Sequence, residues 1–202
     1  MKFTAAFAAL AVTIAVDAAA TIGKRQSSEC YSASLDLSVY ERSFVYPLFE
    51  QCSNALSTEE AKQNPWVNKD CVAAAIVASL PDFHNALECV ENSDSITLPD
   101  YSTWPSLDYN VYASIVGDCA WADGGCPVTM QNFVDLIYGS ISTESKAVYP
   151  DSTTTLTKYY ITPVFTWTSV SVDAGIPYTN FNDWLHHSGS VGHCVPGYPS
   201  GC

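Results

Sequence analysis

The chain of 202 residues carries 21 acidic and only eight basic residues, which gives it a formal net charge of −13 at pH 7. A chain this acidic is repelled by nucleic acids and by anionic membrane surfaces, so neither is expected as a partner. The sequence contains no P-loop, no G-x-G-x-x-G and no G-x-S-x-G motif. We therefore expect no nucleotide or other cofactor, and no serine nucleophile of the hydrolase type.

The first twenty residues have the layout of a secretory signal peptide. Lys2 supplies a short basic start, an apolar run follows over residues 3–16, and small side chains close the segment at residues 18–20. The run is too short for a comfortable membrane span, and no later segment approaches the roughly 20 apolar residues that a span needs. We therefore expect a secreted, extracellular protein without a membrane span.

A dibasic pair, Lys24 and Arg25, lies just beyond this segment. It resembles the processing site of the Kex2-type endoproteases of the fungal secretory pathway. Residues 21–25 would then be a short propeptide, and residues 26–202 a single disulfide-rich globular domain that begins at Gln26. Removal of residues 1–25 takes away three basic residues and one acid, so the mature chain would have a formal charge of −15.

All the cysteines lie within this expected mature chain. An even number of cysteines behind a signal peptide predicts disulfides, four of them here. The spacing does not suit zinc, because no C-x-x-C is present. The pairing cannot be deduced from sequence, although Cys119 and Cys126 are near enough to pair across the turn that Gly124 and Gly125 require. The eight are Cys30, Cys52, Cys71, Cys89, Cys119, Cys126, Cys194 and Cys202.

Apolar residues recur at helical spacing through the first half of the mature chain. Residues 36–53 predict a helix that Pro47 kinks or breaks. The alanine-rich residues 68–80 predict a buried helix ended by Pro81, and residues 82–90 a short helix that carries Cys89.

Two more helices are expected in the middle of the chain. One carries an apolar stripe from Leu107 up to Asp118, and the other begins at a Thr129 cap. The second should turn Phe133, Leu136, Ile137 and Ile141 inward. The predicted fold is therefore all-α, a compact bundle of about six or seven short helices laced by disulfides.

The segment over residues 152–172 leaves two alternatives open. Its threonine, tyrosine, valine and isoleucine content favours a single strand or a hairpin. Leu156, Tyr160, Val164 and Trp167, however, recur at helical spacing, and residues 151–152 could cap a helix. We favour a helix kinked at its proline, because the rest of the chain is predicted to be helical.

Three of the four histidines gather in the C-terminal segment, NDWLHHSGSVGHCVPGYPSGC. A helix capped by Thr179 or Asn180 would bury Phe181, Trp184 and Leu185 on one face and turn His186 sideways. Asp183 and His187, four residues apart, would meet on the opposite face.

This Asp–His pair allows three interpretations. It could fix an imidazole tautomer for acid–base catalysis, or bind zinc or copper together with His193. The interpretation that we favour is a solvated pair on a helix whose apolar face anchors the tail. Cys194 and Cys202 would then fasten the end of the chain.

Carboxylates beside tryptophans offer a second candidate site. Asp118 and Asp123 flank Trp121, and two further acids, at positions 100 and 108, flank Trp104. Paired carboxylates and an aromatic platform are what a glycosidase needs. In an acidic chain such neighbours also arise by chance, and tryptophans are more often part of the core. His84, alone beside apolar residues, is expected to be structural.

The leader, the Lys24-Arg25 site, the eight cysteines and the absence of an N-glycosylation sequon resemble one class, the small secreted cysteine-rich proteins of filamentous fungi. This class includes effector-like proteins. The resemblance implies action outside the cell and carries over no catalytic residue. We expect a monomeric, non-enzymatic binding or effector-like protein whose partner is an extracellular protein or a cell-wall glycan. The alternatives are a carboxylate-dependent extracellular hydrolase of glycans and a metal-binding exoprotein.

Overall fold

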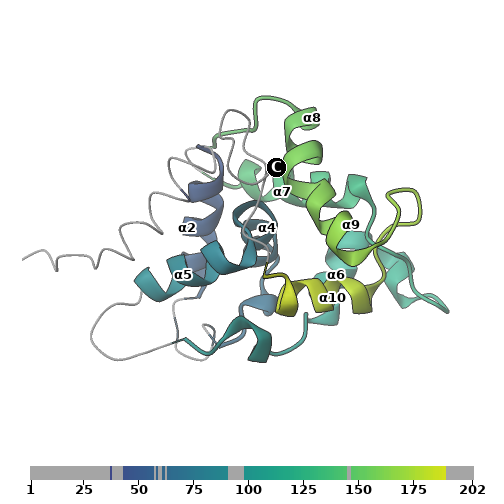
Figure 1. Ribbon diagram of the computed structural model, residues 1–202, viewed down its shortest axis with the longest axis horizontal. Helices are drawn as coiled ribbons and strands as arrows, with labels where there is room; N and C mark the ends of the chain where they lie inside the picture. Colours follow the sequence, from purple (N-terminus) through teal and green to yellow (C-terminus); the bar gives the residue numbers. More distant parts are fainter. Residues whose placement is uncertain are drawn as a thin grey trace, which may run out of the picture.

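The computed structural model describes residues 37, 43–56, 58, 61, 63–90, 98–144 and 147–189. Figure 1 shows short helices gathered around α4 in an arrangement without a sheet. Across the described ranges, the strand-like pairing is confined to one isolated bridge between Val128 and Ile176. The all-α prediction is therefore confirmed. The helices are α2 (Val45–Ala55), α4 (Lys69–Ala78), α5 (Leu80–Val90), α6 (Tyr109–Val116), α7 (Met130–Ser142), α8 (Thr153–Leu156), α9 (Thr162–Thr168) and α10 (Tyr178–His187).

Helix α4 forms the centre of the core. Every residue from Cys71 to Ala78 is buried, and the helix contacts α2, α5, α6 and α7. Its small alanine side chains allow these neighbours to approach closely from several sides. Asn68 begins the helix, since its side chain accepts a hydrogen bond from the Asp70 N–H at 2.8 Å. The predicted buried helix is thus confirmed.

The break between α4 and α5 lies before the predicted position. Ser79 has a positive φ of 66° and ends α4, whereas Leu80 already belongs to α5. Pro81 therefore sits in the first turn of a helix, where its missing N–H costs no hydrogen bond. The same principle places Pro47 in the first turn of α2, as expected for the alternative in which it marks a break. Residues 36 and 38–42 of the predicted helix lie outside the described residues.

A disulfide between Cys52 and Cys71 fastens α2 to α4, with a Cα–Cα distance of 4.6 Å. Both cysteines are buried. Cys89, on α5, is also disulfide-bonded. Cys30, Cys194 and Cys202 lie outside the described residues, as do the expected signal peptide and the Lys24-Arg25 site.

Helices α6 and α7 form as predicted. Asp108 caps α6 by accepting hydrogen bonds from the N–H groups of Asn110 and Val111. Thr129 and Asn132 form a capping box at the start of α7, and the Asn132 amide also donates to the Ile115 carbonyl, which links the two helices. The four residues of α7 that were expected to turn inward are all buried.

Residues 152–168 form a continuous helical segment, so the helical alternative is confirmed. Ser152 caps it, and a π turn over Thr157–Ile161 separates α8 from α9. The π turn ends two residues before Pro163, whose ring would clash with a carbonyl in a regular helix. Leu156, Tyr160 and Val164 are buried as the helical spacing predicted, whereas Trp167, expected on the same inward stripe, is 37% exposed.

Candidate functional site

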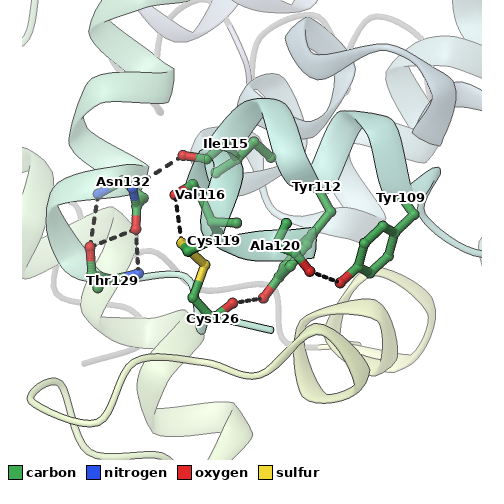
Figure 2. Close-up of a disulfide and its surroundings, with 9 residues drawn as sticks. All are labelled: Tyr109, Tyr112, Ile115, Val116, Cys119, Ala120, Cys126, Thr129 and Asn132. Carbon is green, nitrogen blue, oxygen red and sulfur yellow. Dashed lines mark hydrogen bonds between the residues drawn. A yellow bond between two sulfur atoms is a disulfide. The ribbon is translucent and has the colours of Figure 1, made fainter. Parts of the chain in front are cut away.

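A disulfide between Cys119 and Cys126 closes a short loop after α6, as the spacing predicted. Gly124 and Gly125 turn the chain with φ angles of 84° and 63°, a conformation that glycine adopts without strain. Figure 2 shows the disulfide beneath α6, next to the tyrosines of that helix. We call residues 119–126 the disulfide loop.

Helix α10 is fastened to the chain between residues 104 and 107 by three polar side chains at positions i, i+4 and i+8. The Tyr178 hydroxyl donates to the Leu107 carbonyl at 2.6 Å, and the Asn182 side chain accepts from the Leu107 N–H at 2.8 Å. The His186 Nε2 lies 2.9 Å from the carbonyl oxygen of Trp104. These contacts fix the first turn of α10, and with it Tyr178, beside α6.

A pocket of about 460 Å³ opens where the disulfide loop, α6 and the start of α10 meet. Its volume lies within the ordinary range of small-molecule sites. No charged side chain is among the described residues that line it, and three of those residues are tyrosines. The lining residues are Tyr109, Tyr112, Gly124, Gly125, Cys126, Pro127, Val170, Ala174, Gly175, Pro177, Tyr178 and Asn180. We call this the tyrosine pocket.

The three tyrosine rings pack against one another, with ring centroids 5.1 to 5.5 Å apart. Each hydroxyl donates to a backbone carbonyl: Tyr109 to Ala120 at 2.7 Å, Tyr112 to Cys126 at 2.5 Å, and Tyr178 to Leu107. Figure 2 shows the first two directed at the disulfide loop. The pocket is therefore lined by ring carbons more than by free hydrogen-bonding groups.

Burial also favours the neutral form of two of these phenols, those of Tyr112 and Tyr178. Burial raises the pKa of Tyr112 to about 12, and the neighbouring Tyr109 and Tyr178 add to this effect. The pKa of Tyr178 is raised as well, first by burial and then by the negative charge of Asp108. Neither phenol is therefore suited to act as a nucleophile or base near neutral pH.

Trp121 stands beside the pocket on the disulfide loop. Its ring is 62% exposed, and its centroid lies 4.9 Å from that of Tyr109 in an edge-to-face arrangement. The expectation that tryptophans belong to the core holds for Trp66, Trp104 and Trp184 but is wrong for Trp121 and Trp167. An exposed aromatic ring next to an aromatic pocket is a typical contact surface for a ligand.

The carboxylate candidates have different roles in the structure. Asp118 and Asp123 are both exposed on either side of Trp121. Asp108 caps α6, and Asp100 caps the short turn Tyr101–Thr103. Hydrogen bonds from Ser102 lower the pKa of Asp100, which keeps it ionised. The Asp100 and Asp108 side chains therefore accept hydrogen bonds from backbone N–H groups and have structural roles, as expected if their nearness to Trp104 arises by chance.

The structure places Asp183 and His187 on the exposed face of α10, and no hydrogen bond or ion pair between these two described residues is found. Phe181, Trp184 and Leu185 are buried, as predicted. His193 lies outside the described residues. Within the described ranges, no group of three or more histidine, cysteine, aspartate or glutamate side chains is placed to hold a metal ion.

The beginning of α10 and the place of His186 differ from the prediction. Neither Thr179 nor Asn180 caps the helix, which starts at Tyr178 directly after Pro177. His186 is only 6% exposed, because it packs onto the backbone of residues 104–105. His84 is structural in character, with its Nε2 3.0 Å from the Pro99 carbonyl and its ring against Trp104.

Among the described residues, no helix is both long and apolar enough to cross a membrane. Comparisons with protein-family models, with curated proteins and with solved structures found no match to this chain. Function must therefore be inferred from the residues themselves.

Proposed function

We propose that this chain is a secreted, disulfide-stabilised acidic protein that acts outside the cell by binding a partner, without catalysis, in the manner of effector-like proteins. The observation that carries the proposal is the tyrosine pocket beside the exposed ring of Trp121. None of its described lining residues is a histidine, lysine or carboxylate that could transfer a proton. Such a lining favours binding over chemistry.

Secretion is supported by the leader, the Lys24-Arg25 pair and the disulfides in the described part of the chain. The test is the intact mass of the protein recovered from the medium of a fungal expression host. We expect a chain that begins at Gln26 and has no thiol that reacts before reduction. A mass that includes residues before Gln26, or a thiol alkylated without reduction, contradicts this part of the proposal.

The proposed partner is an extracellular protein or a cell-wall glycan, bound by a monomer. The test incubates the mature protein with insoluble chitin, β-glucan and cellulose, and separately with an immobilised extracellular protein fraction. We expect retention on one of these that Trp121→Leu removes. Trp167→Leu is the matched control, because this exposed tryptophan lies on α9, whereas the ring of Trp121 packs against the lining residue Tyr109. Equal retention of both variants would rule out the pocket as the binding site.

A hydrolase acting on glycans is the second candidate, because Asp118 and Asp123 stand exposed on both sides of Trp121. Release of reducing ends in the same incubations measures it. Release that disappears in both Asp118→Asn and Asp123→Asn would establish the hydrolase in place of the binding protein. The metal-binding alternative is tested by calorimetric titration with zinc, comparing the wild type with His187→Ala and His193→Ala.

A further inference from the structure

The tyrosine pocket combines an aromatic lining with acidic residues next to that lining in the chain. Its described lining residues carry no formal charge. Three aspartates adjoin lining residues in the chain: Asp108 precedes Tyr109, Asp123 precedes Gly124, and Asp173 precedes Ala174. The negative charge of Asp108 contributes, after burial, to the raised pKa of Tyr178. The pocket is therefore a largely apolar space whose charged neighbours in the chain are acidic.

Positive charge close to the pocket is scarce. Within the described ranges, the lysines and arginines are Lys69, on α4, and Lys158, whose ammonium group lies over the ring of Tyr159. Neither lines the pocket. A cation that enters meets aspartates of opposite sign and no described lining residue of like sign, whereas an anion is repelled.

The aromatic rings near the pocket add a second attraction for a cation. The faces of tyrosine and tryptophan rings are electron-rich, and a cation within about 6 Å of the ring centre is attracted to them. Tyr109, Tyr112 and Tyr178 pack together as one aromatic wall of the space, and the exposed Trp121, whose ring packs against Tyr109, continues this aromatic surface next to the pocket. Figure 2 shows how the rings of Tyr109 and Tyr112 project from α6 toward the disulfide loop.

The small number of free polar side chains in the pocket lining limits which kind of cation the pocket can bind. All three tyrosine hydroxyls already donate to backbone carbonyls, and Asn180 is the one other described lining residue with a polar side chain. A sugar or a primary ammonium needs several hydrogen-bond partners when it leaves water. An alkylated ammonium group needs few, because alkyl groups cover its charge.

We propose that the tyrosine pocket binds an alkylated ammonium group against the aromatic wall that Tyr109, Tyr112 and Tyr178 form, with the exposed ring of Trp121, beside Tyr109, at the edge of this wall. This inference rests on the proposed binding function and names the chemistry of its ligand. The group could belong to a small quaternary ammonium compound or to a trimethylated lysine of an extracellular protein.

The experiment compares choline with 3,3-dimethylbutan-1-ol, which has the same shape but carbon in place of the charged nitrogen. Binding is followed by calorimetry and by the NMR signals of the indole N–H groups. We expect choline to bind at least about tenfold more tightly than the neutral compound, a difference of about 1.4 kcal/mol. A peptide that contains trimethyllysine distinguishes the two sources, since a protein ligand should bind more tightly as the peptide than as free choline.

Three variants test the named groups. Trp121→Leu should weaken choline binding by about tenfold, whereas the control Trp167→Leu should leave it unchanged. Asp123→Asn should weaken it by about two- to threefold at low ionic strength and less at high salt. Because Trp121 and Asp123 are exposed, none of these losses is expected from misfolding.

The outcomes distinguish a failure of the ammonium inference from a failure of the proposed binding function. Equal affinity for choline and its neutral isostere, or equal effects of Trp121→Leu and Trp167→Leu, overturns the ammonium site. Tighter binding of cellotetraose than of choline also overturns it and points to a neutral glycan. If choline fails while Trp121-dependent retention on a wall glycan or an extracellular protein persists, the inference is wrong and the proposed binding function stands.

Discussion

The imidazole of His186 joins α10 to the backbone at Trp104. Its Nε2 lies 2.9 Å from the Trp104 carbonyl oxygen, and its Nδ1 lies 2.6 Å from the carbonyl oxygen of Asn182, one turn earlier in the same helix. A neutral imidazole has one N–H and can donate to only one of these oxygens, whereas the protonated ring donates to both. The neighbouring His187 is exposed, so adjacent histidines of one helix serve different purposes.

This difference predicts opposite outcomes for two adjacent substitutions. His186→Ala leaves buried carbonyls without their donor and a void beneath α10, so we expect a loss of about 2–3 kcal/mol in the free energy of unfolding. His187→Ala should change it by less than about 0.5 kcal/mol, because the side chain is exposed. Urea denaturation of the mature protein and both variants measures this. A larger effect at position 187 than at 186 would show that α10 docks differently.

The tyrosine cluster predicts a loss of stability in alkaline solution. The folded-state pKa of Tyr112 is about 12, above the ordinary value of 10, so the unfolded chain loses this proton at a lower pH than the folded chain does. The resulting stabilisation is complete below about pH 10 and is lost as the pH rises toward 12. Tyr112→Phe, which cannot ionise, should unfold with a shallower dependence on pH in this window. Tyrosinate absorbance and circular dichroism, followed together, measure it.

Two glycine substitutions should change stability in opposite directions. Gly175 has a φ of 70°, and a Cβ added there would lie 3.0 Å from the ring of Pro127 and 3.1 Å from the Val128 carbonyl oxygen. Gly175→Ala should therefore destabilise the fold by about 2 kcal/mol or more. Gly139 lies in the exposed middle of α7 with open space around it, so Gly139→Ala should stabilise by about 0.5–1 kcal/mol. The melting temperature should fall in Gly175→Ala and rise in Gly139→Ala. A melting temperature unchanged by Gly175→Ala would contradict the close contact with Pro127.

The helices were predictable because their signals are local. The burial of Phe181, Trp184 and Leu185 follows from helical spacing, and the cap at Thr129 from the chemistry of one side chain. The π turn before Pro163 was not predicted, although a proline inside a helix indicates a kink or another irregularity near it. The stripe of Leu156, Tyr160 and Val164 is nevertheless buried as expected, and only Trp167 departs from it.

The tyrosine pocket was not predictable, because its parts are distant in sequence. Tyr109 and Tyr112 come from α6, whereas Tyr178 comes from α10. Trp121 was singled out for its neighbouring carboxylates, and the tyrosines that it adjoins were missed. The one available signal was the spacing of Tyr178, Asn182 and His186, which places three hydrogen-bonding groups on one side of a helix. Their partners are backbone atoms of residues 104–107, which a side-chain pattern does not reveal.

In the connection between α4 and α5, glycine is expected to stabilise the fold more than alanine does, which is the reverse of their usual order in a helix. Ser79 is buried, and its backbone angles are φ 66° and ψ 155°. Residues other than glycine adopt this backbone conformation at a cost of about 1–3 kcal/mol. The Ser79 hydroxyl donates to the Asp82 carboxylate at 2.8 Å, and its carbonyl accepts from the Phe83 N–H at 3.0 Å. The first of these bonds is lost in both Ser79→Ala and Ser79→Gly, but only glycine relieves the strained backbone.

We therefore expect Ser79→Gly to be more stable than Ser79→Ala by about 1 kcal/mol, the relief of strain less the greater unfolded-state entropy of glycine. Ser114, on the exposed side of α6, supplies the control: there the alanine variant should be the more stable, by about 1 kcal/mol. Chemical denaturation of the four variants tests the comparison directly. If alanine were the better residue at both positions, Ser79 would have an ordinary backbone conformation, and the break between the two helices would then have to come from Pro81 alone.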